Sequence, residues 1–313
     1  MSQPDAEIKA LSDTLIHEII NAVGIPETKT VQRIFRFFFH EIADRLAVIG
    51  VTADHMIATD GFPAASGWMA SHWVQGVTTR GAETVPPEGP LLVVSNHSGA
   101  YDFLVIPSQL NRKDIKLIAS DAPFLKSLPN ACDHLYFTSG EASASMAAAR
   151  GAIRHLTSGG SLLLFGTGLI DPDPAVYPDA EAWIEKWLPS IDLFLRLVPE
   201  TKVLVSITSG IVSPRWAHHP ITRLKRIDWQ RRRLAEAGQV IEQLFRPGRL
   251  YVSPRVSFAP PASVDELRSE SQGDRLLPAI IARGKALLKD HVAWTKSLAK
   301  ETTDVVQKNF NKL

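Results

Sequence analysis

Cysteine is almost absent from this sequence, because Cys132 is the single one among 313 residues. One cysteine cannot form an intramolecular disulfide, so nothing indicates an oxidising compartment. An excess of one charge is also lacking, since 34 basic and 33 acidic residues leave a formal net charge of +1. Binding to nucleic acid through bulk positive charge is therefore not expected, and no nucleic-acid partner is predicted.

Long hydrophobic runs are missing as well. The longest, 161–165 and 203–207, have the length of a strand, whereas a helix that spans a bilayer needs about 20 apolar residues. The first residues, MSQPDAEIKALSDTL, contain acids and lack the basic and apolar blocks of a signal peptide. We therefore expect a cytoplasmic protein that is soluble or bound peripherally at the inner membrane surface.

The pattern of apolar residues divides the chain near residue 80. Leu11, Leu15 and Ile19 recur at helical spacing, and a second helix is expected over about 27–47, followed by an amphipathic stretch that ends near Val77. After residue 80, apolar runs of strand length alternate with helical segments. Strands are expected at 91–95, 115–119, 134–138, 161–165, 202–208 and 250–258, and helices at 102–110, 142–157, 181–197, 228–245 and from about 275.

This alternation predicts the α/β class, with a mostly parallel central sheet covered by helices on both faces. The helical residues 1–80 are interpreted as an N-terminal helical domain, and residues 81–313 as the α/β domain. An aromatic segment, Phe35–Phe39 with Arg33 and Arg36 beside it, allows two interpretations. It either lies on a membrane surface or packs on its own domain.

The most informative segment follows the first buried strand, at residues 96–102. His97 lies just beyond the strand end, where ligands of open α/β sheets bind, and Asp102 comes five residues later at the expected start of a helix. The small residues between them allow a tight loop that brings the carboxylate to the imidazole. Asp102 would then fix the tautomer of His97, whose other nitrogen would take a proton from an attacking hydroxyl.

NHSGAYD (96–102) resembles the first motif of the glycerolipid acyltransferases, which include glycerol-3-phosphate and lysophosphatidic acid acyltransferases. The resemblance continues in order through FLKSLP (124–129), the strand–helix–Gly-Gly–strand segment 134–168, and KVLVSITSG (202–210). It implies the α/β fold, with His97 as general base and Asp102 as its orienting partner. It also implies that no cofactor is needed, since an acyl thioester of coenzyme A or acyl carrier protein is a co-substrate.

The chain departs from the family at the positions that normally hold phosphate. The third motif, usually Pro-Glu-Gly-Thr-Arg, reads Phe165-Gly166-Thr167-Gly168, and the arginine of the second motif is replaced within Ser139-Gly140-Glu141. Ser120 replaces a common basic residue, and Ser206 replaces the proline of the fourth motif. The residues expected to contact substrate are Asn96, Lys126, Gly166, Thr167, Gly168 and Arg215. Amides in 96–99 or 166–168 are candidate oxyanion donors.

A basic stretch follows the strand at 202–208; its residues are Arg215, His218, His219, Arg223, Lys225, Arg226, Arg231, Arg232 and Arg233. It either binds lipid headgroups, an acidic carrier protein or coenzyme A phosphates, or is the solvated face of a helix. His218 and His219 are adjacent and have no cysteine or carboxylate cluster beside them, so no metal site is predicted.

Two functions remain open from the sequence. The first is an O-acyltransferase of glycerolipid and phospholipid synthesis, whose partners are a thioester donor, a hydroxyl-bearing lipid or glycerol-type acceptor, and a membrane surface. The intact His97–Asp102 pair favours this enzyme. The second is a lipid- or acyl-binding protein with the same fold and no turnover, which the altered third motif favours.

Overall fold

A single mixed sheet organises the chain. The computed structural model describes residues 3–23, 29–139, 141–271 and 275–310, and the side chains at 5–18, 37–139, 141–271 and 275–300. The strands are β1 (Thr78–Arg80), β2 (Leu91–Ser95), β3 (Lys116–Ser120), β4 (Leu135–Thr138), β5 (Ser161–Phe165), β6 (Lys202–Ser209) and β7 (Arg255–Phe258). They are ordered β1-β7-β6-β2-β5-β3-β4 in the sheet.

Five neighbouring strands, from β6 across to β4, run parallel to one another. The edge is reversed, because β7 pairs antiparallel with β6, and β1 follows β7 in parallel. Parallel strands need crossover helices, and these cover both faces. The predicted fold class, a mostly parallel α/β sheet with flanking helices after N-terminal helices, is confirmed.

The central strands are apolar throughout because both of their faces are buried. Leu92 and Val94 of β2 contribute to the core on one face, together with α7 (Ala142–Thr157), α9 (Ser190–Leu197), α12 (Val264–Glu270) and α13 (Leu277–Phe310). Leu91 and Val93 contribute to the core on the other face, with α2 (Lys29–Asp60), α3 (Phe62–Ala70), α4 (Asp102–Ser108) and α11 (Asp228–Phe245). Successive side chains alternate between the two faces, so each strand serves both cores.

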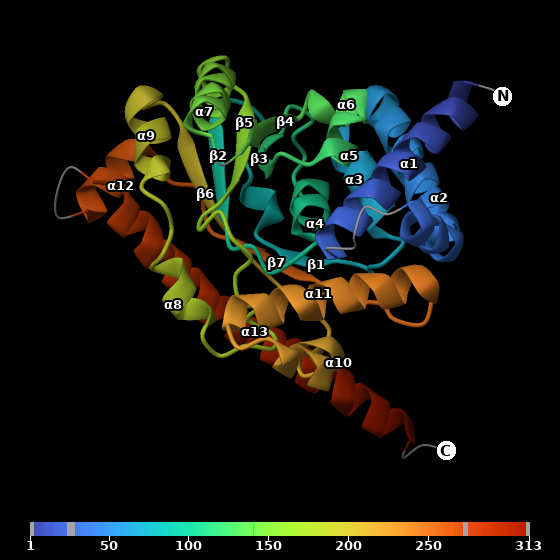
Figure 1. The fold of residues 1–313 in the computed structure, drawn as a ribbon. Helices are drawn as coiled ribbons and strands as arrows, with labels where there is room; N and C mark the ends of the chain where they lie inside the picture. Colours follow the sequence, from blue (N-terminus) through green and yellow to red (C-terminus); the bar gives the residue numbers. More distant parts are fainter. Residues whose placement is uncertain (1–2, 24–28, 140, 272–274, 311–313) are drawn as a thin grey trace.

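The N-terminal helices α1 (Gln3–Val23), α2 and α3 gather beside α5 (Pro123–Lys126) and α6 (Pro129–Cys132), whereas α13 runs as one long helix to the C-terminus (Figure 1). Ile42 of α2 and Phe62 of α3 belong to the same core as the sheet residues. The domain boundary at residue 80 stays a prediction. No described helix is both long enough and apolar enough to cross a membrane.

Three predicted elements differ markedly in extent. The helix predicted over about 27–47 continues to Asp60 as α2. The helix predicted at 181–197 is divided into α8 (Ala180–Ile184) and α9, because the Leu188 amide turns away to bond the Gly166 carbonyl at 2.7 Å and Pro189 has no amide hydrogen. Of the strand predicted at 250–258, only β7 forms a ladder. The remaining short elements are η1 (Ala82–Thr84), α10 (Pro214–Ala217) and η2 (Pro220–Leu224).

The aromatic segment of α2 is exposed in part. Phe37 and Phe38 are exposed, whereas Phe39 packs edge-on against Phe245 of α11, with ring centroids 5.7 Å apart. The side chains of Arg33, Phe35 and Arg36 lie outside the described residues, as does Gly140. The packing interpretation therefore holds for Phe39 and not for its two neighbours.

A buried histidine attaches α13 to the reversed edge of the sheet. His291 contacts the Ser209 hydroxyl of β6 through Nε2 and the Ser257 hydroxyl of β7 through Nδ1, both at 2.7 Å. Burial, with Arg80 and Arg255 nearby, lowers the pKa of His291 to about 3. The ring is therefore neutral at ordinary pH, and it links the last helix to two strands.

Candidate active site

The imidazole of His97 and the carboxylate of Asp102 meet at the end of the central strand. Nδ1 of His97 lies 3.2 Å from Oδ2 of Asp102, which also accepts the Gly99 amide at 3.0 Å. Asp102 is fully buried at the start of α4, and the His97 side chain is 23% exposed. Among the described residues, Nε2 of His97 has no hydrogen-bond partner. The pair therefore has one nitrogen held by a carboxylate and the other open to a ligand.

Asn96 fixes the loop that carries this pair. Its Oδ1 accepts the Thr208 amide at 2.8 Å, and its Nδ2 donates to the Thr208 carbonyl at 2.9 Å and to the Ser98 hydroxyl at 2.8 Å. The Ser98 hydroxyl donates in turn to the Thr208 carbonyl. The side-chain amide expected to bind substrate is thus engaged within the protein, and it ties the His97 loop to β6.

Asp171 holds the backbone of His97 from the other side. Its Oδ2 accepts the His97 amide at 3.0 Å, and its own amide donates to the His97 carbonyl at 2.6 Å. Oδ1 of Asp171 accepts the Thr167 hydroxyl at 2.5 Å. Burial raises the pKa of Asp171 to about 6. This carboxylate lies in the loop after β5, in the same region where the family motif would place its missing glutamate.

The same loop also fixes the segment after β6, through Asp173. Oδ1 accepts the amides of Ala175 and Gly210, and Oδ2 accepts those of Ile211 and Val212, at distances of 2.7–3.0 Å. Asp173 is fully buried. Burial raises its pKa to about 6, although the four amides oppose that shift. Asp171 and Asp173 therefore connect the loops that follow β2, β5 and β6 to one another.

Glu236 of α11 brings a further carboxylate to the His97 loop. It is buried, accepts the Ala100 amide, and lies so near Gly99 that a Cβ there would be 3.4 Å from its Oε1. Burial raises the pKa of Glu236 to about 7. Phe165 covers one side of the imidazole, with ring centroids 4.1 Å apart and planes 16° from parallel. His97 thus lies between an aromatic ring and three carboxylates.

These neighbours set the protonation of His97. Burial alone lowers its pKa, but the hydrogen bond and charge of Asp102, with the charges of Glu236 and Asp171, outweigh it and raise the pKa above 6.5. Oδ1 of Asp102 is buried without a hydrogen-bond partner in the described structure. The site therefore stabilises the imidazolium that a general base becomes when it takes a proton.

We expect the pH profile of kcat/KM to report this shift. The base must be neutral, so activity should rise with pH through the raised pKa of His97, above 6.5. Glu236→Gln keeps the shape and removes a negative charge, so the rising limb should move to lower pH. Glu242→Gln on the same helix is the matched control, because Glu242 pairs with Arg215 and Trp216. An unchanged limb in Glu236→Gln would contradict the assignment.

The Gly166-Thr167-Gly168 segment is closely packed. The Gly166 amide donates to the Ser95 carbonyl, and that of Gly168 donates to the Phe165 carbonyl. A Cβ on Gly166 would lie 2.4 Å from the Trp187 indole. Because glycine has no side chain, the Trp187 ring packs directly against the backbone at this position. Of these three amides, only that of Thr167 has no acceptor among the described residues.

The two cations expected at the substrate have other partners. Lys126 of α5 is exposed and lies 2.6 Å from an Asp121 oxygen. Arg215 of α10 is exposed and lies 2.9 Å from an oxygen of Glu242. A buried cation does lie near the site: Arg232, one turn before Glu236 on α11, packs 4.6 Å from the Trp183 ring centroid and 3.7 Å from Asp179.

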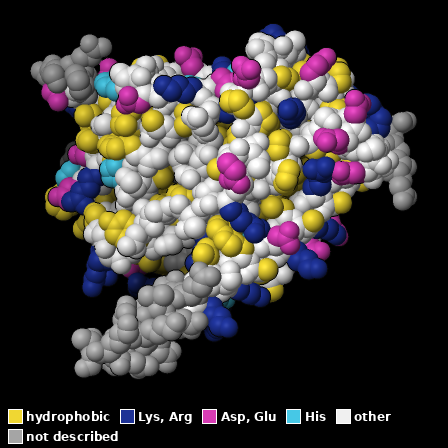
Figure 2. Space-filling model, turned by 180° about the vertical axis from the view of Figure 1, so that it is seen from behind, with side chains coloured by type: hydrophobic (Ala, Val, Ile, Leu, Met, Phe, Trp, Pro, Cys, Tyr) yellow, Lys and Arg dark blue, Asp and Glu magenta, His cyan; other side chains and the backbone are white. Residues whose placement is uncertain are grey.

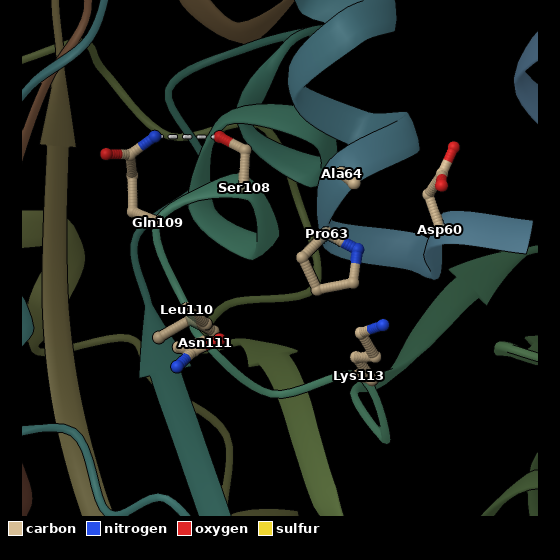
Figure 3. A pocket seen from close by; sticks show the side chains of 8 residues that line it. All are labelled: Asp60, Pro63, Ala64, Ser108, Gln109, Leu110, Asn111 and Lys113. Carbon is tan, nitrogen blue, oxygen red and sulfur yellow. Dashed lines mark hydrogen bonds between the residues drawn. The ribbon is translucent and has the colours of Figure 1, made fainter. Parts of the chain in front are cut away.

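Two pockets of the described surface are lined by residues other than the dyad. One, of about 290 Å³, lies between α3 and the loop after α4, lined by residues that include Asp60, Pro63 and Lys113 (Figure 3). Its Gln109 is already bonded to Ser108 and Thr79. The other, of about 480 Å³, lies between α9 and the start of α13. Neither lining includes His97 or Asp102.

The sequence profile of the acyltransferase family matches residues 76–181, which include β2, the His97 loop and the Asp171 and Asp173 carboxylates. The match covers about a third of the chain, so these residues are similar to an acyltransferase domain. The predicted resemblance and the prediction of an acyltransferase enzyme are confirmed at the level of this family. Curated protein sequences give no significant match to the chain.

A structural comparison pairs the chain with the 1-acyl-sn-glycerophosphate (LPA) acyltransferase PlsC of Thermotoga maritima. The TM-score is 0.43 and the identity 12%, over 92% of this chain and 95% of that one.

Several residues around the dyad of the acyltransferase domain were not predicted. Asp171 and Asp173 carry a usable signal, since two carboxylates alternate with prolines in the loop that follows the strand 161–165. Glu236 gives no such signal, because it is one of three acids in a helix that also holds three arginines, more than 130 residues from His97. Trp187 gives no signal in the sequence either, since a tryptophan within a predicted helix most often packs into a core.

Proposed function

We propose that this chain transfers a fatty acyl group from a thioester of coenzyme A or acyl carrier protein to a hydroxyl of a glycerol-type or lysophospholipid acceptor. The observation that carries the proposal is the contact of 3.2 Å between His97 Nδ1 and Asp102 Oδ2 at the end of β2. Such a pair makes a hydroxyl nucleophilic without a serine or cysteine of the protein. The donor would meet the chain in the cytoplasm, and the lipid acceptor at the inner membrane surface.

The chemistry uses the two ring nitrogens in different roles. Nδ1 donates its hydrogen to Asp102, which leaves Nε2 as the acceptor of a proton. As the acceptor oxygen attacks the thioester carbonyl, its proton passes to Nε2, and the imidazolium is stabilised by Asp102. The C–S bond then breaks, the proton of His97 goes to the leaving thiolate, and the ester and free thiol depart. No metal or cofactor enters these steps.

The tetrahedral intermediate needs a donor for its oxyanion. The amides of His97, Gly99, Gly166 and Gly168 already have acceptors within the protein. The Thr167 amide has none in the described structure and lies between Phe165, which stacks on His97, and Asp171, which bonds its backbone. We therefore assign the oxyanion contact to Thr167 in preference to the two glycines.

An acyl-binding protein without turnover is the second candidate. It is favoured by the third motif, where the glutamate and arginine of the family are absent and the glycine amides are occupied. In that case His97 and Asp102 would remain in contact without catalysing transfer, and a bound acyl thioester would stay intact. The pKa of His97, raised by three carboxylates, favours the enzyme instead.

We expect a labelled ester when pure protein is incubated with labelled palmitoyl thioester and a panel of hydroxyl acceptors. An uncharged alcohol or another lipid should be preferred to glycerol 3-phosphate, because each lost charged hydrogen bond costs about 1.5–3 kcal/mol and basic residues are missing at Ser120, Ser139–Gly140 and Gly168. Tight acyl binding without an ester would select the binding protein.

The acceptor preference has its own control. Should glycerol 3-phosphate be the best acceptor, Arg232→Lys, Arg215→Ala and Lys126→Ala identify the cation that replaces the missing ones. An increased KM in one variant would show a rebuilt phosphate site. An unchanged KM in all three would contradict both the repurposed pocket and the rebuilt site.

A further inference from the structure

Apolar side chains point outward on one continuous segment of the surface. Between η2 and the first turn of α11, Leu224 is 77% exposed, Ile227 52%, Trp229 46% and Ile221 41%. A single exposed apolar residue is ordinary, but four within nine residues form a patch that a soluble surface usually avoids. We refer to these four residues as the apolar patch.

Basic side chains surround the apolar patch. The stretch from Pro220 to Arg233 contains six basic residues and one acidic residue. Arg231 pairs with that acid, Asp228, at 3.3 Å, and Arg232 turns inward. Throughout the described residues, Arg223, Lys225 and Arg226 have no carboxylate within ion-pair distance. On the face of the molecule that Figure 2 shows, Lys and Arg are interspersed with Asp and Glu.

The apolar patch is connected to the His97 loop through α11. It continues into α11, which carries Glu236 against the His97 loop and whose Gln239 is bonded to the Ser213 amide and the Ile211 carbonyl. Figure 1 places α10 beside α11, and the two helices are in contact. A partner surface that binds the apolar patch would therefore lie on the same side of the molecule as α11. This helix covers the loops at the strand ends.

We propose that the apolar patch, with Arg223, Lys225 and Arg226, docks this chain on an anionic phospholipid membrane. Exposed aliphatic side chains and a tryptophan insert at the boundary between headgroups and acyl chains, while unpaired cations face the phosphates. This docking proposal rests on the proposed function in one respect, namely that the membrane would supply the lipid substrate of the enzyme. Docking itself does not require turnover.

The test measures co-sedimentation with phosphatidylcholine vesicles that contain a minority of phosphatidylglycerol. The wild type should bind them and not pure phosphatidylcholine, and binding should weaken between about 0.1 M and 1 M salt as the screening length falls from about 10 to 3 Å. Each basic side chain contributes roughly five-fold to affinity, so Arg223→Ser/Lys225→Ser/Arg226→Ser should lose roughly 10²-fold. Leu224→Ser/Ile227→Ser/Trp229→Ser should also release the protein.

The matched control is Leu193→Ser/Leu197→Ser on α9, which removes two other exposed leucines well away from α11 (Figure 1). This variant should bind as the wild type does. Equal loss in the control, or full binding by either triple variant, overturns the proposal. Capture of acyl carrier protein without vesicle binding also overturns it, in favour of an acidic protein partner.

Two further measurements separate docking from catalysis. Quenching by lipids with brominated acyl chains should fall in Trp229→Phe, which keeps an aromatic ring and removes the indole that inserts. Both triple variants should retain the far-UV circular dichroism of the wild type and its activity on a water-soluble short-chain thioester and alcohol. If vesicle binding follows the expected pattern while no variant or wild type makes ester, docking stands and the proposed function fails.

Discussion

Replacing His97 by Ala should lower turnover by about 10²–10⁴-fold, the usual contribution of a general base. The variant should fold, because the His97 side chain is partly exposed and its loop is held by the backbone bonds of Asp171 and by the Asn96 amide. Steady-state rates with labelled thioester, together with circular dichroism, check both parts of the expectation. Near-wild-type turnover in a folded His97→Ala preparation would falsify the mechanism.

Two companion variants sharpen this result. Asp102→Asn should fall in a similar range, because an amide that donates to Nδ1 leaves the hydrogen on Nε2, which then cannot accept a proton. His72→Ala is the control, since His72 is exposed and contacts the carbonyls of Trp68 and Met69 after α3. If His72→Ala keeps its activity, the loss of turnover in His97→Ala results from the change at the His97 site and not from removal of a histidine in general.

Replacing Asp173 by Ala should have the largest effect on stability. The change leaves the amides of Ala175, Gly210, Ile211 and Val212 without their acceptor at a fully buried position. An unsatisfied buried donor costs about 1–3 kcal/mol, so the loss should exceed about 3 kcal/mol even if water enters and partners some of the amides. Urea unfolding, with the midpoint and slope compared between variants, measures it.

Asp192→Ala is the matched comparison for Asp173. Asp192 is also a buried carboxylate, but among the described residues it accepts only the amides of Leu276 and Leu277, just before and at the start of α13. Loss of such a cap typically costs about 0.5–2 kcal/mol. An equal or smaller loss in Asp173→Ala would show that its loop does not hold the ends of β5 and β6 together.

Much of this architecture follows from local patterns. The helices α7 and α11 begin and end at the residues that the apolar periodicity predicts, and β2 and β5 match the apolar runs. A strand buried on both faces is mostly apolar along its length, so it is visible without knowledge of its neighbours. The strand β7 is shorter than predicted, because Pro254 interrupts the run 250–258 and has no amide hydrogen for the ladder.

The dyad was visible for a related reason. His97 and Asp102 are five residues apart, so the contact between them is made within one loop, and the strand before them places that loop at the ligand-binding edge of the sheet. The departures from the family motifs were visible too, since absent arginines need no structure to be noticed. Such local relations depend on few residues, and these are adjacent in the chain.

The sequence by itself determined the class of the fold, the closeness of His97 and Asp102 after a strand end, and the absence of basic residues at Ser120, Ser139–Gly140 and Gly168. Only the tertiary structure decided what surrounds His97: Asp171 at its backbone, Glu236 arriving from α11, and Trp187 occupying the space beside Gly166. These contacts join segments separated by tens to more than a hundred residues. Their distances, and the burial that raises the pKa values of Asp171 and Glu236, arise when the loops at three strand ends and one helix pack together, which no local pattern encodes.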